Sequence, residues 1–233
     1  MRKKVAILLL FILMQNASIS QEGFGKKQVI FNVSIGAPHL TKTTVRLITK
    51  TDAFKNSFNN IAGVTVKGLN PVSFKCEYGF NKYFGLGITL AAWNLKIDLT
   101  DRYNVLNSSQ TLGADSVDIY KFKITSASIG IRPSLHIPTG DLYNDVYFSL
   151  GLGYTKLSLT VDFNSTDINR TLPVFDYRKK FSLPGSFYVS PLLGYRHYFS
   201  KPLAGVIEFG WEKGAIIQAG LSLRCGKINS EKK

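Results

Sequence analysis

The sequence predicts an all-β protein: an eight-stranded antiparallel up-and-down transmembrane β-barrel, preceded by a cleavable signal peptide. Three observations predict this fold. They are an export signal at the N-terminus, period-two alternation of apolar side chains in segments of roughly ten residues, and connections that are alternately long and short. The 233 residues have room for one domain with about eight membrane strands and their loops.

Residues 1–20 have the pattern of a signal peptide. Three cations precede an apolar run from Val5 to Met14, and small residues follow before Gln21. The run is shorter than the roughly 20 residues of a membrane-spanning helix, and no later run is long enough for one. If residues 21–225 cross a membrane, they must do so as a closed barrel, because only closure satisfies every backbone group of a sheet in lipid. The polar tail 226–233 is expected to be disordered.

The alternation separates side chains that face lipid from side chains that face the lumen. In the first expected strand, 28–37, the apolar set begins at Val29 and ends at Ile35. The fourth strand ends in a polar inward series: Ser126, Ser128, Gly130, Arg132 and Ser134. The other strands are expected at 71–80, from Phe84 onward, and around 147–154, 192–198, 207–211 and 217–224.

The connections alternate in length. The first three odd connections are long, at 38–69, 100–117 and 163–185, whereas the even ones are short, at 81–83, 137–145 and 199–204. This asymmetry is typical of outer-membrane barrels, which have short periplasmic turns and long outer loops. The fourth outer connection, 212–214, is tight. Within 38–69, either a short amphipathic helix or a solvated loop fits the pattern Val45, Leu47, Ile48, Phe54 and Phe58.

Six charged residues fall in the inward phase: Lys75, Glu77, Arg132, Arg196, Glu208 and Arg224. Charges in a narrow barrel must pair or be hydrated, because an isolated buried charge is costly. We therefore expect a lumen network with more cations than carboxylates, in which Glu77 and Glu208 each bridge arginines. A polar plug is the leading interpretation, since eight strands enclose an interior that side chains fill. A narrow anion-preferring pore and a catalytic carboxylate pair are the alternatives.

The chain is strongly basic, with a net charge of +14, or +11 without the three cations of the signal peptide. An exported protein rarely meets nucleic acid, so outer-membrane lipids and lipopolysaccharide phosphates are the expected partners. The cations of the long connections could clamp such phosphates, or could simply solvate the loops. They are Lys42, Arg46, Lys50, Lys55, Arg170, Arg178, Lys179 and Lys180.

The histidines and cysteines predict no metal, cofactor or catalytic site. His39, His136 and His197 share no metal-ligand spacing, and His39 beside Thr41 is a very weak signal for nucleophilic catalysis. In an eight-stranded barrel, the first strand lies between the strands of Cys76 and Cys225. The two cysteines are then two strand spacings apart, which together make about 9–10 Å. That distance exceeds the roughly 7 Å limit for bridged Cα atoms, so two free, outward-facing thiols are expected.

Three segments carry a resemblance to a known family: "YGFNKYFGLGI", "ITSASIGIRPSLHI" and "GYRHYFSKPLAGVIEFGW". They resemble the hairpins of small eight-stranded outer-membrane barrels of the OmpA/OmpX type, including the outer membrane protein beta-barrel domain and porin-like families common in Bacteroidota. The resemblance implies the fold and a place in the bacterial outer membrane. One departure is that the last strand closes with Leu223-Arg224-Cys225 where many such barrels end on an aromatic residue.

Together these patterns lead us to expect a monomeric, non-enzymatic barrel with periplasmic termini and a structural or surface-interaction role. Its loops would touch lipopolysaccharide or a surface or secretion-system partner protein. One alternative is a narrow porin-like channel for small anionic or polar solutes. A second is a soluble lipocalin-like carrier or a lipid-modifying barrel enzyme. Conductance would reveal the channel, and release without detergent would reveal the soluble carrier.

Overall fold

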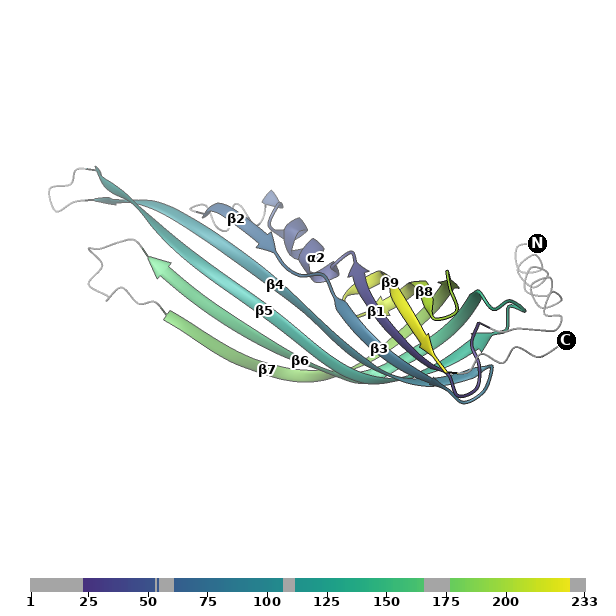
Figure 1. Cartoon of the computed structure of the whole chain (residues 1–233). Helices are drawn as coiled ribbons and strands as arrows, with labels where there is room; N and C mark the ends of the chain where they lie inside the picture. Colours follow the sequence, from purple (N-terminus) through teal and green to yellow (C-terminus); the bar gives the residue numbers. More distant parts are fainter. Residues whose placement is uncertain (1–22, 53, 55–60, 107–111, 166–176, 227–233) are drawn as a thin grey trace, which may run out of the picture.

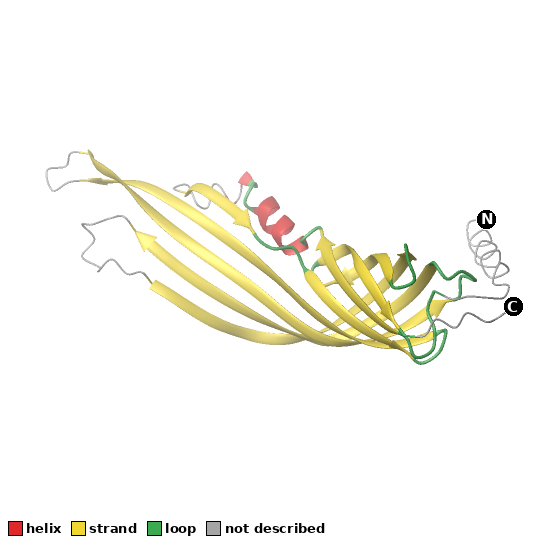
Figure 2. Cartoon of the chain, viewed as in Figure 1, coloured by secondary structure: helices red, strands yellow, loops and turns green. Residues whose placement is uncertain are grey.

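A computed structural model describes residues 23–52, 54, 61–106, 112–165 and 177–226, which form an antiparallel β structure with one labelled helix (Figures 1 and 2). The expected signal peptide and all of the polar tail except Gly226 lie outside the described residues. In chain order the elements are β1 (Val29–Ala37), α2 (Leu40–Ile48), β2 (Ile61–Lys67), β3 (Val72–Gly79), β4 (Phe84–Leu106), β5 (Leu112–Ile137), β6 (Asn144–Ser165), β7 (Tyr177–Tyr198), β8 (Leu203–Glu212) and β9 (Ala215–Cys225).

Eight of these strands close into a barrel. Their order is β4-β3-β1-β9-β8-β7-β6-β5, and an additional pairing of β4 with β5 completes the ring. At the seam, β1 pairs with β9 from Val29 opposite Cys225 to Ala37 opposite Ile217. Neighbouring barrel strands follow one another along the chain, so the expected eight-stranded antiparallel up-and-down barrel is confirmed. Within the described part of the chain, no helix is long and apolar enough to cross a bilayer.

The barrel has a polar inside and an apolar outside. Along β1, Asn32 and Ser34 are buried, whereas Val33 and Ile35 are each more than half exposed. The other barrel strands repeat this alternation because successive side chains of a strand point to opposite faces. The outward apolar band contains, among others, Phe74, Leu86, Ile88, Leu90, Ile129, Ile131, Leu135, Phe148, Leu152, Val189, Leu193, Phe209 and Leu221.

Strands β4 to β7 are much longer than the rest and continue past the barrel as a curved projecting sheet (Figure 1). The expected loops 100–117 and 163–185 are therefore wrong in large part, and only 107–111 and 166–176 of them lie outside the described residues. The physical reason is a change of polarity. In the projecting part of β4, Leu95 is buried on the inward side while Lys96 is exposed on the outward side. The period-two pattern continues there, but its polarity is the reverse of that expected for a membrane strand: the apolar side chain faces inward and the charged one faces outward.

The connection 38–69 contains a helix and an unexpected ninth strand. His39 caps α2 by accepting a hydrogen bond from the backbone N–H of Lys42 at 3.4 Å. The helix carries Val45, Leu47 and Ile48, so the amphipathic-helix alternative holds for that part of the segment. Strand β2 extends the sheet by pairing with the projecting half of β4, between Lys96 and Asp101.

The two cysteines are free thiols, as expected. Cys76 lies on β3 and Cys225 on β9, and β1 runs between these strands and pairs with both. The strand order thus keeps the two thiols on strands that do not touch.

Candidate functional site: a charged lumen

The lumen holds all six charged residues that the alternation places inside. Each is at most 5% exposed, and they come from five strands: Lys75 and Glu77 from β3, Arg132 from β5, Arg196 from β7, Glu208 from β8 and Arg224 from β9. Buried charges are stable only when they are neutralised and hydrogen-bonded. The partners of each charge therefore decide what the lumen can do.

The first cluster is centred on Glu208. Its Oε1 accepts hydrogen bonds from Arg132 Nη2 at 2.5 Å and from the Tyr147 hydroxyl at 2.7 Å, and its other oxygen forms an ion pair with Lys75. The Lys75 ammonium also lies 2.6 Å from Glu212 Oε2 and 3.1 Å from Gln218 Oε1. The cluster joins β3, β5, β6, β8 and β9, so it ties both sides of the barrel together.

The second cluster is centred on Glu77 and lies nearer the end where the described chain begins. Glu77 Oε2 accepts from Arg196 Nη2 at 2.6 Å, and Glu77 Oε1 lies 2.9 Å from His136 Nε2. Asp145 closes the ring: its oxygens lie 2.7 Å from His136 Nδ1 and 2.7 Å from Arg196 Nη1. Both nitrogens of the imidazole face carboxylate oxygens, one of Glu77 and one of Asp145.

Tyr147 lies between the two clusters. Its ring centroid is 4.1 Å from the Arg196 guanidinium and 5.4 Å from that of Arg132, so it contacts a cation of each cluster. The ring packs against the backbone of β7 at Gly194, where a Cβ would lie 2.1 Å from its Cζ atom. The absence of a side chain at Gly194 makes room for this buried aromatic bridge.

Among the described residues, the two clusters do not contain more cations than carboxylates. Lys75 and Arg132 face Glu208 and Glu212, while Arg196 and His136 face Glu77 and Asp145. The expected excess of cations is therefore not present among them. Glu208 bridges an arginine and a lysine, and Glu77 bridges an arginine and a histidine, so neither joins two arginines in the part of the chain that the structure describes.

Several members of the clusters were missed in the sequence, although a signal was present. Asp145 lies two residues before the inward Tyr147, and His136 lies two residues after the inward Ser134, so each continues a recognised inward phase. Glu212 is close to the tight β8–β9 turn. Its contact with Lys75 of β3 depends on the closed geometry and has no sequence signal.

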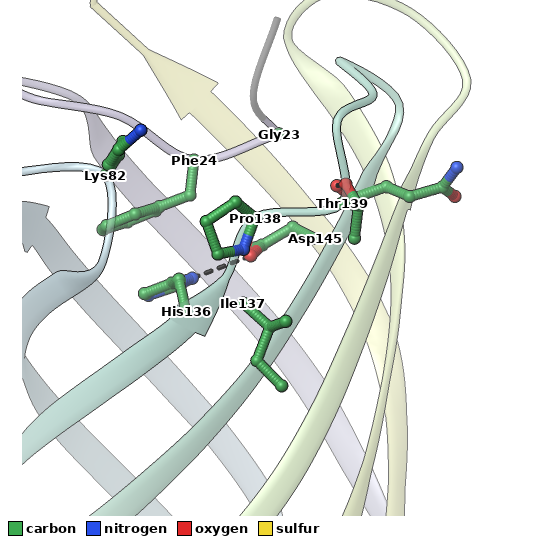
Figure 3. A pocket seen from close by; sticks show the side chains of 9 residues that line it. Gly23, Phe24, Lys82, His136, Ile137, Pro138, Thr139 and Asp145 are labelled. Atoms are coloured by element: carbon green, nitrogen blue, oxygen red, sulfur yellow. Dashed lines mark hydrogen bonds and ion pairs between the residues drawn. The ribbon is translucent and has the colours of Figure 1, made fainter. Parts of the chain in front are cut away.

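The end of the barrel near the first described residues is sealed by the chain itself. Phe24 is 2% exposed, and its ring stacks on His136 (Figure 3). Arg224, the sixth predicted charge, stands apart from the clusters and donates a hydrogen bond from Nη1 to the Gly23 carbonyl at 2.6 Å. The cavity beside Phe24, His136 and Asp145 has a volume of only about 10 Å³, which is room for a single water molecule.

The cations predicted for the outer loops do not form one group. Lys42 and Arg46 of α2 donate to the carbonyls of Gly68 and Val66, which ties the helix to the end of β2. Arg178 pairs with Asp162 at 3.4 Å, Lys179 lies 5.2 Å from the Phe181 ring centroid, and Lys50 and Lys180 are exposed. Lys55 and Arg170 lie outside the described residues.

The three histidines lie in separate environments. His39 packs edge-on against Trp93 at the end of the barrel away from Phe24, and burial lowers its pKa. His197 is exposed and lies 2.9 Å from Asn144 Oδ1. No group of three or more His, Cys, Asp or Glu side chains suited to a metal ion occurs in the described ranges.

No protein-family model and no curated protein matches the chain. Among solved structures, it is similar to the N-terminal β-barrel domain of OprF from Pseudomonas aeruginosa, with 10% identity and a TM-score of 0.43 over 87% of this chain and 100% of that chain. It is also similar to Ail, the attachment invasion locus protein of Yersinia pestis, with 12% identity and a TM-score of 0.36 over 86% of this chain and 95% of that chain. The outer membrane protein OprG from Pseudomonas aeruginosa has 13% identity and a TM-score of 0.42 over 89% of this chain and 100% of that chain.

Proposed function

We propose that the mature chain is a monomeric, non-enzymatic barrel of the bacterial outer membrane with a structural or surface-interaction role and a non-conducting lumen. The observation that carries this proposal is the inside-out polarity of the barrel. Interlocked charges fill its interior, and large apolar side chains cover its exterior.

The apolar exterior supports the membrane assignment. Leaving one large aliphatic side chain in water costs roughly 1.5–3 kcal/mol relative to burying it, and the band repeats this exposure around the whole ring. Along β6 the outward apolar side chains run from Val146 to Tyr154, about 27 Å at about 3.4 Å per residue. With an ordinary strand tilt, this gives a height of roughly 20 Å, close to the roughly 25 Å apolar band of outer-membrane barrels.

Aromatic side chains at the two ends of the band support the same placement. Tyr143 and Phe199 lie at the end near Phe24, and Phe187 and Trp211 lie at the other. Aromatic rings gather at membrane–water interfaces in barrels. The long strands lie beyond Phe187 and Trp211, so we assign that side to the cell exterior and the side of Gly23 and Gly226 to the periplasm.

The interior supports a closed lumen. The two clusters and the ring of Tyr147 bond strands on opposite sides of the barrel, so a passing ion would have to separate buried ion pairs. Phe24 adds a second obstruction at the periplasmic end. The carboxylates of Glu77, Asp145 and Glu208 are each bonded to cations, which favours a structural role over acid–base chemistry.

The test combines fractionation with conductance. The exported protein should be recovered in the outer membrane, and its gel migration should change on boiling in detergent. Reconstituted in a planar bilayer, it should give no ion-selective single-channel steps, and Arg132→Ala should not remove any background current. A soluble protein with unchanged migration would exclude the membrane assignment. Steady conductance that disappears in Arg132→Ala would favour the narrow channel.

A further inference from the structure

The outer face of the projecting sheet carries a row of lysines in register. Lys67 of β2 lies opposite Lys96 of β4, which lies opposite Lys123 of β5. The row continues through Thr160 of β6 to Lys180 of β7. All four lysines are exposed, and we call Lys67, Lys96, Lys123 and Lys180 the lysine row.

No carboxylate neutralises the lysine row from within. Like charges directly opposite each other on neighbouring strands destabilise a sheet. The next row outward shows the usual solution, because Asp98 lies opposite Lys121, which lies opposite Asp162, which lies opposite Arg178. Two rows that are adjacent on the same face therefore differ in kind, one alternating in sign and the other purely cationic.

The position of the lysine row suggests what neutralises it. The lysine row lies on the same outward face as the apolar band, farther along the strands. Two rows separate it from the band: one contains Ala92 and Ala127, and the next, which is polar, contains Thr125 and Ser158. Lys156, just beyond the outward Tyr154 on β6, begins the cationic region. The row is thus continuous with the lipid-facing surface, on the side that we assign to the outer leaflet.

The opposite face of the same strands carries apolar side chains. At the level of the lysine row, the inward neighbours include Ile97, Phe122 and Val161, which pair with one another on the opposite face of the sheet. If the cations served only to keep the outer face of the projecting sheet soluble, carboxylates could stand among them. The alternating row has this arrangement. The lysine row instead presents only positive charges. Lys67, Lys96 and Lys123 lie on successive strands of the sheet, about 5 Å apart. Lys180 lies about 10 Å from Lys123, because Thr160 of β6 stands between them.

We propose that the lysine row binds the phosphate groups of glycolipids in the outer leaflet around the barrel. This inference rests on the proposed function, because it requires the projecting sheet to stand on the outer side of the membrane. Lysine suits the task as a compact point charge on a flexible stem that can reach toward head groups. The row would hold the lipid through charge-assisted hydrogen bonds from ammonium groups to phosphate oxygens.

The experiment compares two double variants of the full mature barrel in neutral detergent micelles. Lys96→Gln with Lys123→Gln removes the centre of the lysine row. Lys121→Gln with Arg178→Gln removes the same charge from the same face, but from the alternating row. Binding of diphosphoryl lipid A is measured by native mass spectrometry, and heat-modifiable migration verifies that each variant is folded. A phosphate-free lipid A and soluble inositol hexakisphosphate are the comparison probes.

The lysine-row variant should require about tenfold more diphosphoryl lipid A for half-saturation, consistent with the loss of two cations beside an anionic surface. The alternating-row variant should change this value by less than about threefold, and phosphate-free lipid A should not distinguish the proteins. Equal losses in both variants, or no loss in the lysine-row variant, would overturn the inference. So would inositol hexakisphosphate binding that depends on the row when lipid A binding does not. A barrel that does not enter membranes would instead refute the proposed function.

Discussion

The rings of Phe24 and His136 lie parallel, with 3.4 Å between their centroids and 2° between their planes. Phe24 belongs to the segment before β1, and His136 lies near the end of β5, so the contact carries the start of the described chain across the mouth of the barrel. Because His136 also contacts Glu77 and Asp145, the ring of Phe24 shields the second charge cluster from water at this end of the barrel.

Phe24→Ala should open this mouth. We expect the substitution to lower the free energy of unfolding by about 3–5 kcal/mol, as for other buried phenylalanines replaced by alanine. In a folded sample, His136 should react with diethyl pyrocarbonate much faster than in the wild type, as followed by peptide mass spectrometry. The exposed His197 provides the internal control, because its reaction rate should be the same in both proteins. An unchanged rate at His136 would show that Phe24 does not seal the cluster.

Glu208→Ala should destabilise the barrel strongly. It would leave the buried cations of Arg132 and Lys75 without their shared carboxylate, and breaking one side of a buried ion pair costs about 3–5 kcal/mol. The measurement is urea-dependent folding into lipid vesicles, read from gel migration without boiling. Asp162→Asn is the matched control, since its pair with the largely exposed Arg178 is worth about 0–1 kcal/mol. Similar losses in the two variants would argue against a structural role for the cluster.

Gly194→Ala should strain the contact between β7 and Tyr147. A Cβ at this position would lie 2.1 Å from the ring, so the ring or the strand must move, at a cost of about 1–3 kcal/mol. The same vesicle-folding assay measures the effect. Gly63→Ala on β2 should leave stability nearly unchanged, because nothing lies within 4 Å of its added Cβ.

Lys213, in the turn between β8 and β9, should make stability depend on pH. Burial lowers the pKa of its ammonium to about 7, against an opposing effect of Glu212, and its Nζ lies over the ring of Tyr188. Between about pH 7 and the usual lysine value of 10.5, the unfolded chain binds this proton and the folded chain does not. The free energy of unfolding should therefore rise with pH across that window, which means that the folded barrel becomes more stable.

Lys213→Met should remove this rise, whereas Lys201→Met, at the other end of the barrel, should retain it. Vesicle-folding titrations at several pH values between 7 and 10 measure the slope. A wild-type slope that survives in Lys213→Met would assign the titration to another group.

The barrel part of the fold was predictable because a polar interior and an apolar exterior place side chains of opposite polarity at alternate positions of each strand. Arg132, Arg196 and Glu208 were assigned to the lumen from that alternation alone. The projecting sheet was not recognised, because past the barrel its strands bury an inward apolar side chain, Leu95, and expose an outward cation, Lys96. The partners in the lumen were also out of reach where they depend on strand closure, as for Lys75 of β3 and Glu212 of β8.

The seam between β1 and β9 has a consequence for how the chain reaches its folded state. Residues 29–37 pair with residues 217–225, so the ring cannot close before almost the whole sequence has been made. Pairings between such distant segments form slowly, and until then both strands present open edges that can recruit other chains. Assembly should therefore require each newly made chain to be kept apart from its copies until the ring closes. A version shortened before β9 should aggregate through the unpaired edge of β1 even though most of its hairpins are intact.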